Sequence, residues 1–579
     1  MAILGIDVGG TFTDAVLLDG DRLVTAKVPT EAEQESLVLA AAEAVGAAAG
    51  VERFSHGTTI ATNALLERKG ARTAFVATAG FEHMLHLRRQ TRAHLYRLCE
   101  EHPEPLVPLE RTHGVRERVG PDGVIEPLDL GSLPAVDAEA VAVCTLFSFR
   151  DPTHEAAIAT ELRRRHPHAH VVASHEIAPE FREYERASTA TADAYLGPVC
   201  ARYFRALALR SADAGLPAPL VMRSSGGVIG AKEAAEHPAL VLVSGPAAGV
   251  VGAALVARES GIEDAIAFDM GGTSTDVCLI AGGAAERTSE RAVGGFPIRL
   301  PMIDIHTVGA GGGSIVWRDT GGALRVGPES AGATPGPACY GRGGTRPTVT
   351  DANLVLGRLP VSLPGGLELD RGAAVAALGD LDAAEVIEIV NAEMLRALRV
   401  VSVERGHDPA DFALVAFGGA GPLHACALAD ELGMSTVLVP GSAGVLSALG
   451  LVASDERRDS VTAYVCSLEE AGELPADGEA DLRYRGQSFE LTLPLGPDLP
   501  ERFHRSHEER YGSADRGREI ELVAVRAADV RPGPVLRFPD SEPLRLEGPR
   551  ALELEGATCW IPPGWVGVRD GTTIRLTRL

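Results

Sequence analysis

Two copies of one short motif carry the residues best suited to chemistry. Residues 5–18 and 267–280 align so that an Asp, two Gly, two Thr and a second Asp coincide, counted from Asp7 and Asp269. In each copy an apolar run, a Gly-Gly-Thr turn and a second apolar run follow one another, which predicts a β-hairpin with a glycine-bearing tip. Two such hairpins far apart in the chain indicate two halves that begin with the same unit, and gene duplication explains them simply.

The residue types of these turns suit a phosphate chain. Glycine permits positive φ and close approach of the backbone, while turn amides and threonine hydroxyls donate to phosphate oxygens. Mg²⁺ is commonly held by one or two carboxylates together with phosphates, so Asp7 and Asp269 are predicted as catalytic and metal-holding residues. The predicted phosphate-binding residues are Gly9, Gly10, Thr11, Thr13, Gly271, Gly272, Thr273 and Thr275. One copy alone is read equally well as a plain hairpin tip; the matched pair favours the phosphate role.

A third glycine cluster contains Gly418 and Gly419. It follows an apolar run, 413–417, that predicts a buried strand, and it precedes a helical pattern over 423–432. Glycines between a strand and a helix allow a flat adenine or ribose to lie against the backbone. The alternative is a tight turn without a ligand, and the two phosphate hairpins favour the nucleotide.

The elements that position these residues are alternating strands and helices, which predict α/β domains with mixed sheets. We predict an N-terminal domain over 1–190, a second domain over 191–459 and a β-rich C-terminal domain over 460–579. The uncharged run 239–257 is broken by Ser244-Gly245-Pro246. It is therefore interpreted as a strand over 240–243, a turn and a buried helix, and not as a membrane span.

Composition excludes several classes of partner. A formal net charge of −25 argues against nucleic acid and anionic membranes, because both require a basic face. Eight scattered cysteines without a Cys-x-x-Cys pair indicate a reducing compartment, and the N-terminus shows no secretory signal, so a cytoplasmic location is expected. None of the three lysines is followed by Ser or Thr, which excludes a Walker-type phosphate loop.

The two hairpins and the glycine turn together resemble the actin/Hsp70/sugar-kinase superfamily of ATPases. Over nearly its full length the chain is also similar to the A subunit of the hydantoinase/5-oxoprolinase family, whose relatives include acetone-carboxylase subunits. The segments that carry this resemblance are GIDVGGTFTD from Gly5, HGTTIATN from His56, ERV from Glu117, SHEIAPEFREYER from Ser174, SGPA from Ser244, FDMGGTSTD from Phe268, DIHTVGAGGGS from Asp304, GPACYG from Gly336, RYRGQ from Arg483 and IPPGW from Ile561.

The resemblance implies an α/β fold of duplicated actin-like (ribonuclease H-like) ATPase domains, with a nucleotide cleft between them and a β-rich C-terminal domain. It implies that ATP and Mg²⁺ are used to open a cyclic amide such as a hydantoin or 5-oxoproline, by phosphorylation of the amide oxygen. It further implies a B-type partner subunit, and we expect an oligomer. The tail after Pro532 is shorter than the family pattern, which bears on partner docking more than on ATP binding.

Two other functions remain open at this point. An ATP-dependent ketone carboxylase subunit would use the same hairpins to phosphorylate an enol oxygen or bicarbonate. A non-catalytic actin-like ATPase or filament protein would bind the nucleotide without turning over a small molecule. The HGTT segment and the Asp-x-His pair at residues 304 and 306 speak against the latter, because neither is needed merely to bind ATP.

Residues for the cyclic amide are predicted from three segments. His56 can donate a hydrogen bond or shuttle a proton beside the hydroxyls of Thr58 and Thr59, although a structural histidine is the alternative. Gln90 and Arg92 lie in a segment that resembles the family's Arg-Gln-x-Arg element and are predicted to contact a polar ring, with solvated charge as the alternative.

The third segment contains Asp304 and His306. In a strand these two would share one face, where they would orient the substrate or bind a metal ion, and the glycines at 311–313 would admit an anion. A buried Asp–His hydrogen bond that shapes the loop is the alternative. Cys339 lies in a Gly/Pro-rich loop without an adjacent base, so it is not interpreted as a nucleophile.

Overall fold

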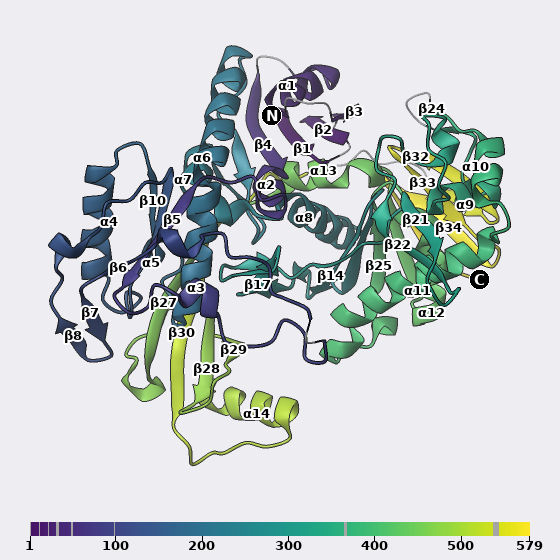
Figure 1. The fold of residues 1–579 in the computed structure, drawn as a ribbon. Coiled ribbons are helices and arrows are strands. Elements are labelled where there is room, and N and C mark those ends of the chain that lie inside the picture. Colours follow the sequence, from purple (N-terminus) through teal and green to yellow (C-terminus); the bar gives the residue numbers. More distant parts are fainter. Residues whose placement is uncertain are drawn as a thin grey trace.

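The computed structural model shows two large mixed sheets on either side of a central pair of helices (Figure 1). It describes residues 2–10, 12–20, 22–30, 34–47, 50–97, 99–363, 367–536 and 543–579. Thr11, which was predicted to bind phosphate, lies outside the described residues. The predicted duplicated α/β fold is confirmed, because each large sheet is built around one copy of the repeated hairpin.

The first large sheet has ten strands. The N-terminal hairpin lies toward one edge, and the parallel strand β4 joins it to the rest of the sheet. The strand order, with bounds, is β29 (Leu491–Pro494), β28 (Glu479–Tyr484), β30 (Ile520–Arg531), β27 (Glu456–Ser467), β12 (Val228–Gly230), β11 (Leu220–Met222), β4 (Val51–Thr58), β1 (Ala2–Val8), β2 (Phe12–Asp19) and β3 (Arg22–Pro29).

The second large sheet repeats this plan. The hairpin of the second motif is followed by two parallel strands, and β20 (His306–Val308) pairs with its second strand outside the main path. The strand order is β15 (Ala284–Ala285), β14 (Thr275–Ala281), β13 (Ala265–Met270), β25 (Ala413–Phe417), β26 (Thr436–Pro440), β35 (Thr573–Arg578), β34 (Trp565–Asp570) and β31 (Leu544–Glu547).

Two apolar helices, α8 (Ser244–Glu259) and α13 (Leu446–Ala453), pack together between these sheets (Figure 1). Glycine makes their close approach possible, since a Cβ at Gly450 would lie 2.0 Å from the carbonyl oxygen of Ala248. The strand predicted over 240–243 is wrong: Pro238–Val241 forms a 3-10 helix that leads into α8. A short apolar run does not distinguish the two conformations, whereas the helix predicted after the turn is present.

The first half also contains a four-stranded parallel sheet in the order β10 (His170–Ala173), β9 (Ala140–Cys144), β5 (Thr73–Thr78) and β6 (Thr112–Val115). Helix α4 (Thr153–Arg165) packs on this sheet, and the 31-residue helix α6 (Glu183–Asp213) joins it to the first large sheet. The remaining helices include α1 (Gln34–Ala44), α2 (Ile60–Leu66), α11 (Ala383–Val401), α12 (Gly421–Leu432) and α14 (Leu499–Tyr511).

The C-terminal residues are rich in strands, but these strands are shared between the two large sheets. Strands β27 to β30 extend the first sheet, while β31, β34 and β35 extend the second. The boundaries at 190 and 459 therefore stay predictions, because both sheets contain strands from either side of residue 459. Within the described residues, no helix has the length and apolar character needed to cross a bilayer.

Candidate active site

The two repeated motifs fold into hairpins of the same geometry. In the first, Asp7 pairs with Asp14 across β1 and β2; in the second, Asp269 pairs with Asp276 across β13 and β14. Each turn is closed by the amide of its first glycine, 3.0 Å from a carbonyl oxygen three residues on: Gly9 to Phe12, and Gly271 to Ser274. The sequence repeat is thus a structural repeat that extends to individual hydrogen bonds.

Each hairpin aspartate lies against a glycine from the neighbouring parallel strand. Gly57 of β4 pairs with Asp7, and a Cβ built on Gly57 would lie 2.3 Å from Asp7 Oδ1. Gly418, directly after β25, stands in the same relation to Asp269, with a distance of 2.2 Å. Any larger residue would displace the carboxylate, so both glycines belong to the site. Gly418 was predicted to belong to a turn that binds adenosine. The structure also places it next to the carboxylate of Asp269.

The carboxyl groups of both aspartates are buried, and the pKa of each is raised. Burial, and then the charge of Asp14, raises the pKa of Asp7 to about 7. Burial, followed by the charges of Asp276 and Asp7, raises the pKa of Asp269 to about 8. The charge of Asp7 is one of the causes of the shift at Asp269, so the two carboxyl groups lie within electrostatic reach of each other. Raised pKa values of buried carboxyl groups are common at functional sites, where a bound cation stabilises the ionised form.

A divalent cation fits this arrangement. Asp7 Oδ1 is buried and has no hydrogen-bond partner within the described residues. Carboxylate oxygens are the ligands that Mg²⁺ prefers, and one or two of them suffice when phosphates complete the shell. In the described part of the chain, no group of three or more His, Cys, Asp or Glu side chains is arranged to hold a metal ion. Asp7 and Asp269 are therefore the candidate Mg²⁺ residues, with the nucleotide supplying other ligands.

Lys27 of β3 was not predicted, and it is the cation that opposes these carboxylates. Its Nζ lies 2.7 Å from Asp14 Oδ1 and 2.8 Å from the carbonyl oxygen of Gly444, and its charge lowers the pKa of both Asp7 and Asp269. The contact with Gly444 links the first half to the second. The register of β2 and β3, which pairs Asp14 with Lys27, brings it here. The sequence contains three lysines, and this rarity was the one signal that could have pointed to Lys27.

Replacing Lys27 with methionine is expected to weaken binding of Mg·ATP by roughly 10- to 100-fold, the usual range for one charge-assisted hydrogen bond. Without this cation the cleft carboxylates repel the phosphates more strongly. Isothermal titration calorimetry would measure the change. Lys69→Met is the matched control, because Lys69 is exposed and pairs with Glu67. Equal affinities for both variants would show that Lys27 plays no part in nucleotide binding.

The glycine loop 309–313 supports the second hairpin. The amides of Gly312 and Gly313 donate to the carbonyl oxygens of Gly271 (3.0 Å) and Gly272 (2.7 Å), and the Gly311 amide donates to Ser314 Oγ at 2.8 Å. These three amides were expected to admit an anion; that expectation is wrong, because each is already bonded within the protein. Thr275 Oγ1 also donates to this loop, to the carbonyl oxygen of Ala310 at 2.5 Å.

The remaining residues that were predicted to bind phosphate differ in exposure: some lie at the hairpin tips and one is buried. Gly10, Gly272 and Thr273 are exposed at the hairpin tips, where their backbone can meet a phosphate. Thr13, in contrast, is fully buried, with its hydroxyl 3.3 Å from that of Thr30. The glycine turn at 418–419 lies beside the second hairpin, since the Ala420 amide donates to the carbonyl oxygen of Met270 at 2.9 Å.

His56 is a core histidine in this structure. Its Nδ1 lies 3.1 Å from the carbonyl oxygen of Ile6 and its Nε2 2.7 Å from the hydroxyl of Tyr203 on α6, and burial lowers its pKa to about 4. Both ring nitrogens are occupied and the ring is neutral at pH 7. The geometry therefore favours the structural alternative for His56, which fixes β1 and β4 on α6, over proton transfer.

The rest of the HGTT segment lies beside the first hairpin. Thr59 Oγ1 is 3.4 Å from the carbonyl oxygen of Val8, and Thr58 is joined to Ser244, whose Oγ donates to the Thr58 carbonyl oxygen at 2.7 Å. Ser244 begins α8, and a Cβ on Gly245 would lie 3.5 Å from Asp7 Oδ1. The N-terminus of the 16-residue helix α8 therefore lies next to Asp7. The sequence alone did not reveal this position.

The predicted shared face of Asp304 and His306 is wrong. Strand β19 (Met302–Ile303) ends before Asp304, the Ile305 amide bonds back to the carbonyl oxygen of Ile303, and only His306 lies in β20. Asp304 instead forms an ion pair with Arg405 at 2.7 Å. This arrangement supports neither the metal site nor the Asp–His hydrogen bond considered for this pair, and catalytic roles for Asp304 and His306 stay predictions.

Gln90 and Arg92 are exposed in the segment after α3 (Met84–Leu87), so their predicted contact with the substrate is not tested by the structure. Cys339 is buried, and burial together with the charge of Asp351 raises the pKa of its thiol well above the usual range. This agrees with the interpretation that Cys339 is not a nucleophile.

The pH dependence of stability tests the coupled aspartates. Because folding raises both carboxyl pKa values above 3.8, the folded protein binds more protons than the unfolded chain between about pH 4 and 8, and these groups make stability fall as pH rises through that window. Mg·ATP is expected to bind the ionised carboxylates, and therefore to raise the melting temperature more at pH 8.5 than at pH 6. An equal increase at both pH values would contradict the assignment.

The same hairpin at the core of two similar sheets defines a duplicated, two-lobed α/β fold of the actin-like class. Family models for hydantoinase/oxoprolinase match residues 186–460, and for the N-terminal region of the same family residues 3–166. The chain belongs to the hydantoinase/oxoprolinase family and is an enzyme.

Three relatives illustrate the range of the family. Caprolactamase subunit alpha of Pseudomonas jessenii is 34% identical to this chain, with 91% of this chain and 86% of the relative covered. The crystal structure of ATP-dependent caprolactamase from the same organism superposes with a TM-score of 0.89, at 30% identity and with 100% of both chains covered. 5-oxoprolinase 1 of Arabidopsis thaliana is 36% identical over 70% of this chain and 36% of its own length. The acetophenone carboxylase gamma subunit of Aromatoleum aromaticum is 35% identical over 77% and 67%.

Proposed function

We propose that this chain is the ATP-using subunit of an enzyme that opens a cyclic amide by phosphorylating the amide oxygen. The observation that carries the proposal is the pair of aspartates with buried carboxyl groups, Asp7 and Asp269, at equivalent positions of two matched hairpins and within electrostatic reach of each other. The likeness to caprolactamase subunit alpha and 5-oxoprolinase supports the choice of a lactam as substrate. Relatives named as subunits support a second, B-type subunit as partner.

The chemistry explains why ATP is consumed. An amide carbonyl is a poor electrophile, so its oxygen first attacks the γ-phosphorus, forming an O–P bond while the bond to ADP breaks. Water then adds to the activated carbon, the ring C–N bond breaks with a proton delivered to nitrogen, and a second water displaces phosphate from the acyl carbon. The sum is lactam, ATP and two waters giving amino acid, ADP and phosphate.

The chain's own residues contribute mainly positioning and charge. Backbone amides at the exposed hairpin tips bind phosphate oxygens, Lys27 offsets negative charge, and Gly57 and Gly418 leave room for the two carboxylates. Mg²⁺, held by Asp7 and Asp269, would neutralise charge on the phosphates. Phosphoryl transfer depends on this kind of positioning and electrostatic stabilisation.

The test is phosphate release from Mg·ATP in the presence of hydantoin, N-methylhydantoin, 5-oxoproline, simple lactams, or acetone with labelled bicarbonate, each with and without the B-type subunit. Stimulation by one cyclic amide, with ring-opened product in equal amount, is expected. Stimulation only by ketone and bicarbonate, with label fixed in the product, would instead establish the carboxylase activity that the acetophenone carboxylase relative suggests. ATP binding without stimulation by any compound would contradict both.

A further inference from the structure

In the first half, the hairpin aspartate begins a row of three polar side chains that ends in a cation. Asp7 of β1 pairs with Asp14 of β2, and Asp14 pairs in turn with Lys27 of β3. Residues directly opposite one another in antiparallel strands share a face of the sheet, so the three side chains lie side by side. Lys27 therefore supplies a positive charge on the face that carries the two carboxylates.

The second half repeats this row but has no charge at its third position. Asp269 of β13 pairs with Asp276 of β14, and Asp276 pairs in turn with Thr307 of β20. Thr307 thus occupies the position of Lys27, and its hydroxyl donates to Asp276 Oδ1 at 2.5 Å. Because neighbouring strands lie about 4.8 Å apart, Thr307 is about 10 Å from Asp269 across the sheet.

Arg291 brings the missing positive charge to the second row from another element. Its Nη2 donates to Thr307 Oγ1 at 3.3 Å. Burial raises the pKa of Asp276, and the hydrogen bond from Thr307 and the charge of Arg291 oppose that rise. Arg291 Nη1, in contrast, is buried and has no hydrogen-bond partner within the described residues. A buried donor without an acceptor is costly, so Nη1 is suited to an acceptor that the described chain does not supply.

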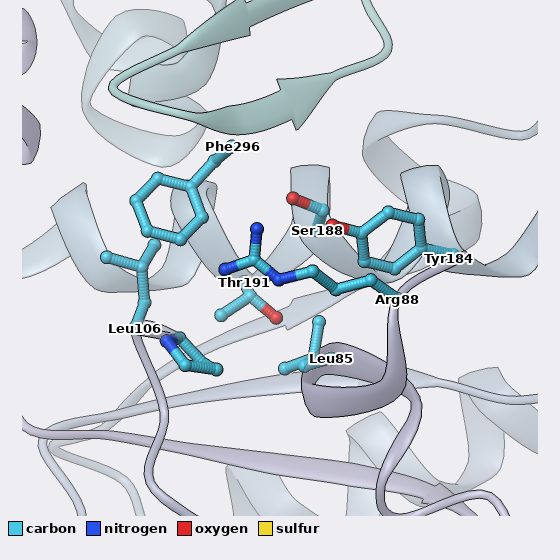
Figure 2. A pocket seen from close by; sticks show the side chains of 8 residues that line it. Leu85, Arg88, Leu106, Tyr184, Ser188, Thr191 and Phe296 are labelled. Carbon is cyan, nitrogen blue, oxygen red and sulfur yellow. The ribbon is translucent and has the colours of Figure 1, made fainter. Parts of the chain in front are cut away.

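Arg291 belongs to a short hairpin that reaches from the second half to the first. This hairpin, called the arm below, consists of β17 (Arg291–Val293) and β18 (Phe296–Ile298). Strand β17 contacts α2, which directly follows the HGTT segment beside Asp7, and β18 contacts α6. Figure 2 shows Phe296 of the arm on the wall of a small pocket whose other lining residues belong to the first half. Arg291 therefore lies where the second row meets the first half.

We propose that Arg291 is a phosphate-binding residue of the nucleotide site and the counterpart, in the second half, of Lys27. Its Nη2 stays on Thr307 while its Nη1 donates to a phosphate oxygen of Mg·ATP, a division of donors that the planar guanidinium permits. Hydrogen bonds from an ionised donor to phosphate are among the strong ones in proteins. The inference rests on the proposed function and adds a residue to its nucleotide site.

The test measures binding of Mg·ATP and of adenosine to the full chain by isothermal titration calorimetry. Arg291→Gln is expected to weaken binding of Mg·ATP by roughly 10- to 100-fold, as loss of one charge-assisted hydrogen bond predicts. Binding of adenosine should not change, because adenosine has no phosphate for Nη1 to meet. Arg291→Lys keeps the charge but cannot hold Thr307 and a phosphate in the same way, so its affinity for Mg·ATP should lie between the two.

Arg325→Gln is the matched control, since Arg325 lies in the same half but is exposed and pairs with Asp319 at 3.0 Å. Melting curves establish that each variant is folded; if Arg291→Gln is not, Arg291→Lys decides, and wild-type affinity for Mg·ATP in that variant would overturn the inference. Equal affinities for Mg·ATP in Arg291→Gln and Arg325→Gln, or an equal loss of affinity for Mg·ATP and adenosine, would also overturn it and leave the proposed function standing. Failure of the wild type to bind Mg·ATP would overturn the proposed function itself.

Discussion

Asp269→Asn is expected to reduce ATP turnover by about 100- to 1,000-fold, the usual cost of removing one preorganised electrostatic group from a transition state. Asparagine keeps the shape of the side chain but removes the charge that Mg²⁺ requires. Asp7→Asn is expected to have a similar effect, because the two residues occupy equivalent positions in the repeated hairpins. Steady-state phosphate release at saturating Mg·ATP measures both.

Although Asp269→Asn should lower ATP turnover, it should raise the stability of the nucleotide-free protein. Burial and neighbouring carboxylates raise the pKa of Asp269 to about 8, so its ionised form destabilises the protein at high pH when no cation is bound. Asp269→Asn is thus expected to raise the melting temperature of the nucleotide-free protein at pH 8.5. Full turnover by Asp269→Asn would show that the second hairpin has no catalytic role.

Gly418→Ala is the second substitution with a large expected effect. Gly418 has a φ of 77°, and the new Cβ would lie 2.2 Å from Asp269 Oδ1 and 2.5 Å from the carbonyl oxygen of Met270. Relief requires movement of the carboxylate or of the second hairpin. We therefore expect a loss of at least about tenfold in ATP turnover, since small misplacements of catalytic groups cost this much or more, together with lower stability.

Gly433→Ala provides the control. Gly433 follows α12 with a φ of 70°, and the nearest atom to an added Cβ is Ala410 Cβ at 3.8 Å. The two substitutions share the backbone penalty of about 1–2 kcal/mol and differ in the contact with Asp269. Differential scanning calorimetry and phosphate release on both variants separate the two effects. Equal turnover in Gly418→Ala and Gly433→Ala would contradict the idea that Gly418 leaves room for the Asp269 carboxylate.

The local parts of the site were predictable because their signals are local. The Gly-Gly-Thr turns appear in the sequence as a repeat, and the Asp positions of the repeat, with Thr13 and Thr275, occupy equivalent positions in the two hairpins. The glycine turn at Gly418 was equally visible, since a strand, a glycine pair and a helical pattern follow one another. In these segments, residue type and spacing within a few positions decide the conformation.

The other features of the site and fold could not be predicted from the sequence, because they depend on contacts between segments that are far apart in the chain. Lys27 reaches the cleft only through the register of β2 and β3, and Gly57 reaches Asp7 only because β4 lies parallel to β1. The C-terminal strands looked like one domain, yet hydrogen bonding assigns them to two sheets. His56 shows the converse: its type suggested chemistry, but its bonds to Ile6 and Tyr203 are those of a buried structural residue.

The path of the amide oxygen tests the central claim most directly. The cyclic amide that stimulates ATP turnover would be labelled with ¹⁸O at its ring carbonyl and converted in unlabelled water, and the released phosphate would be analysed by mass spectrometry. Phosphorylation of the amide oxygen, followed by attack of water on carbon, predicts one ¹⁸O in each phosphate and none in the new carboxylate. Unlabelled phosphate, with all ¹⁸O retained in the amino acid, would contradict the account.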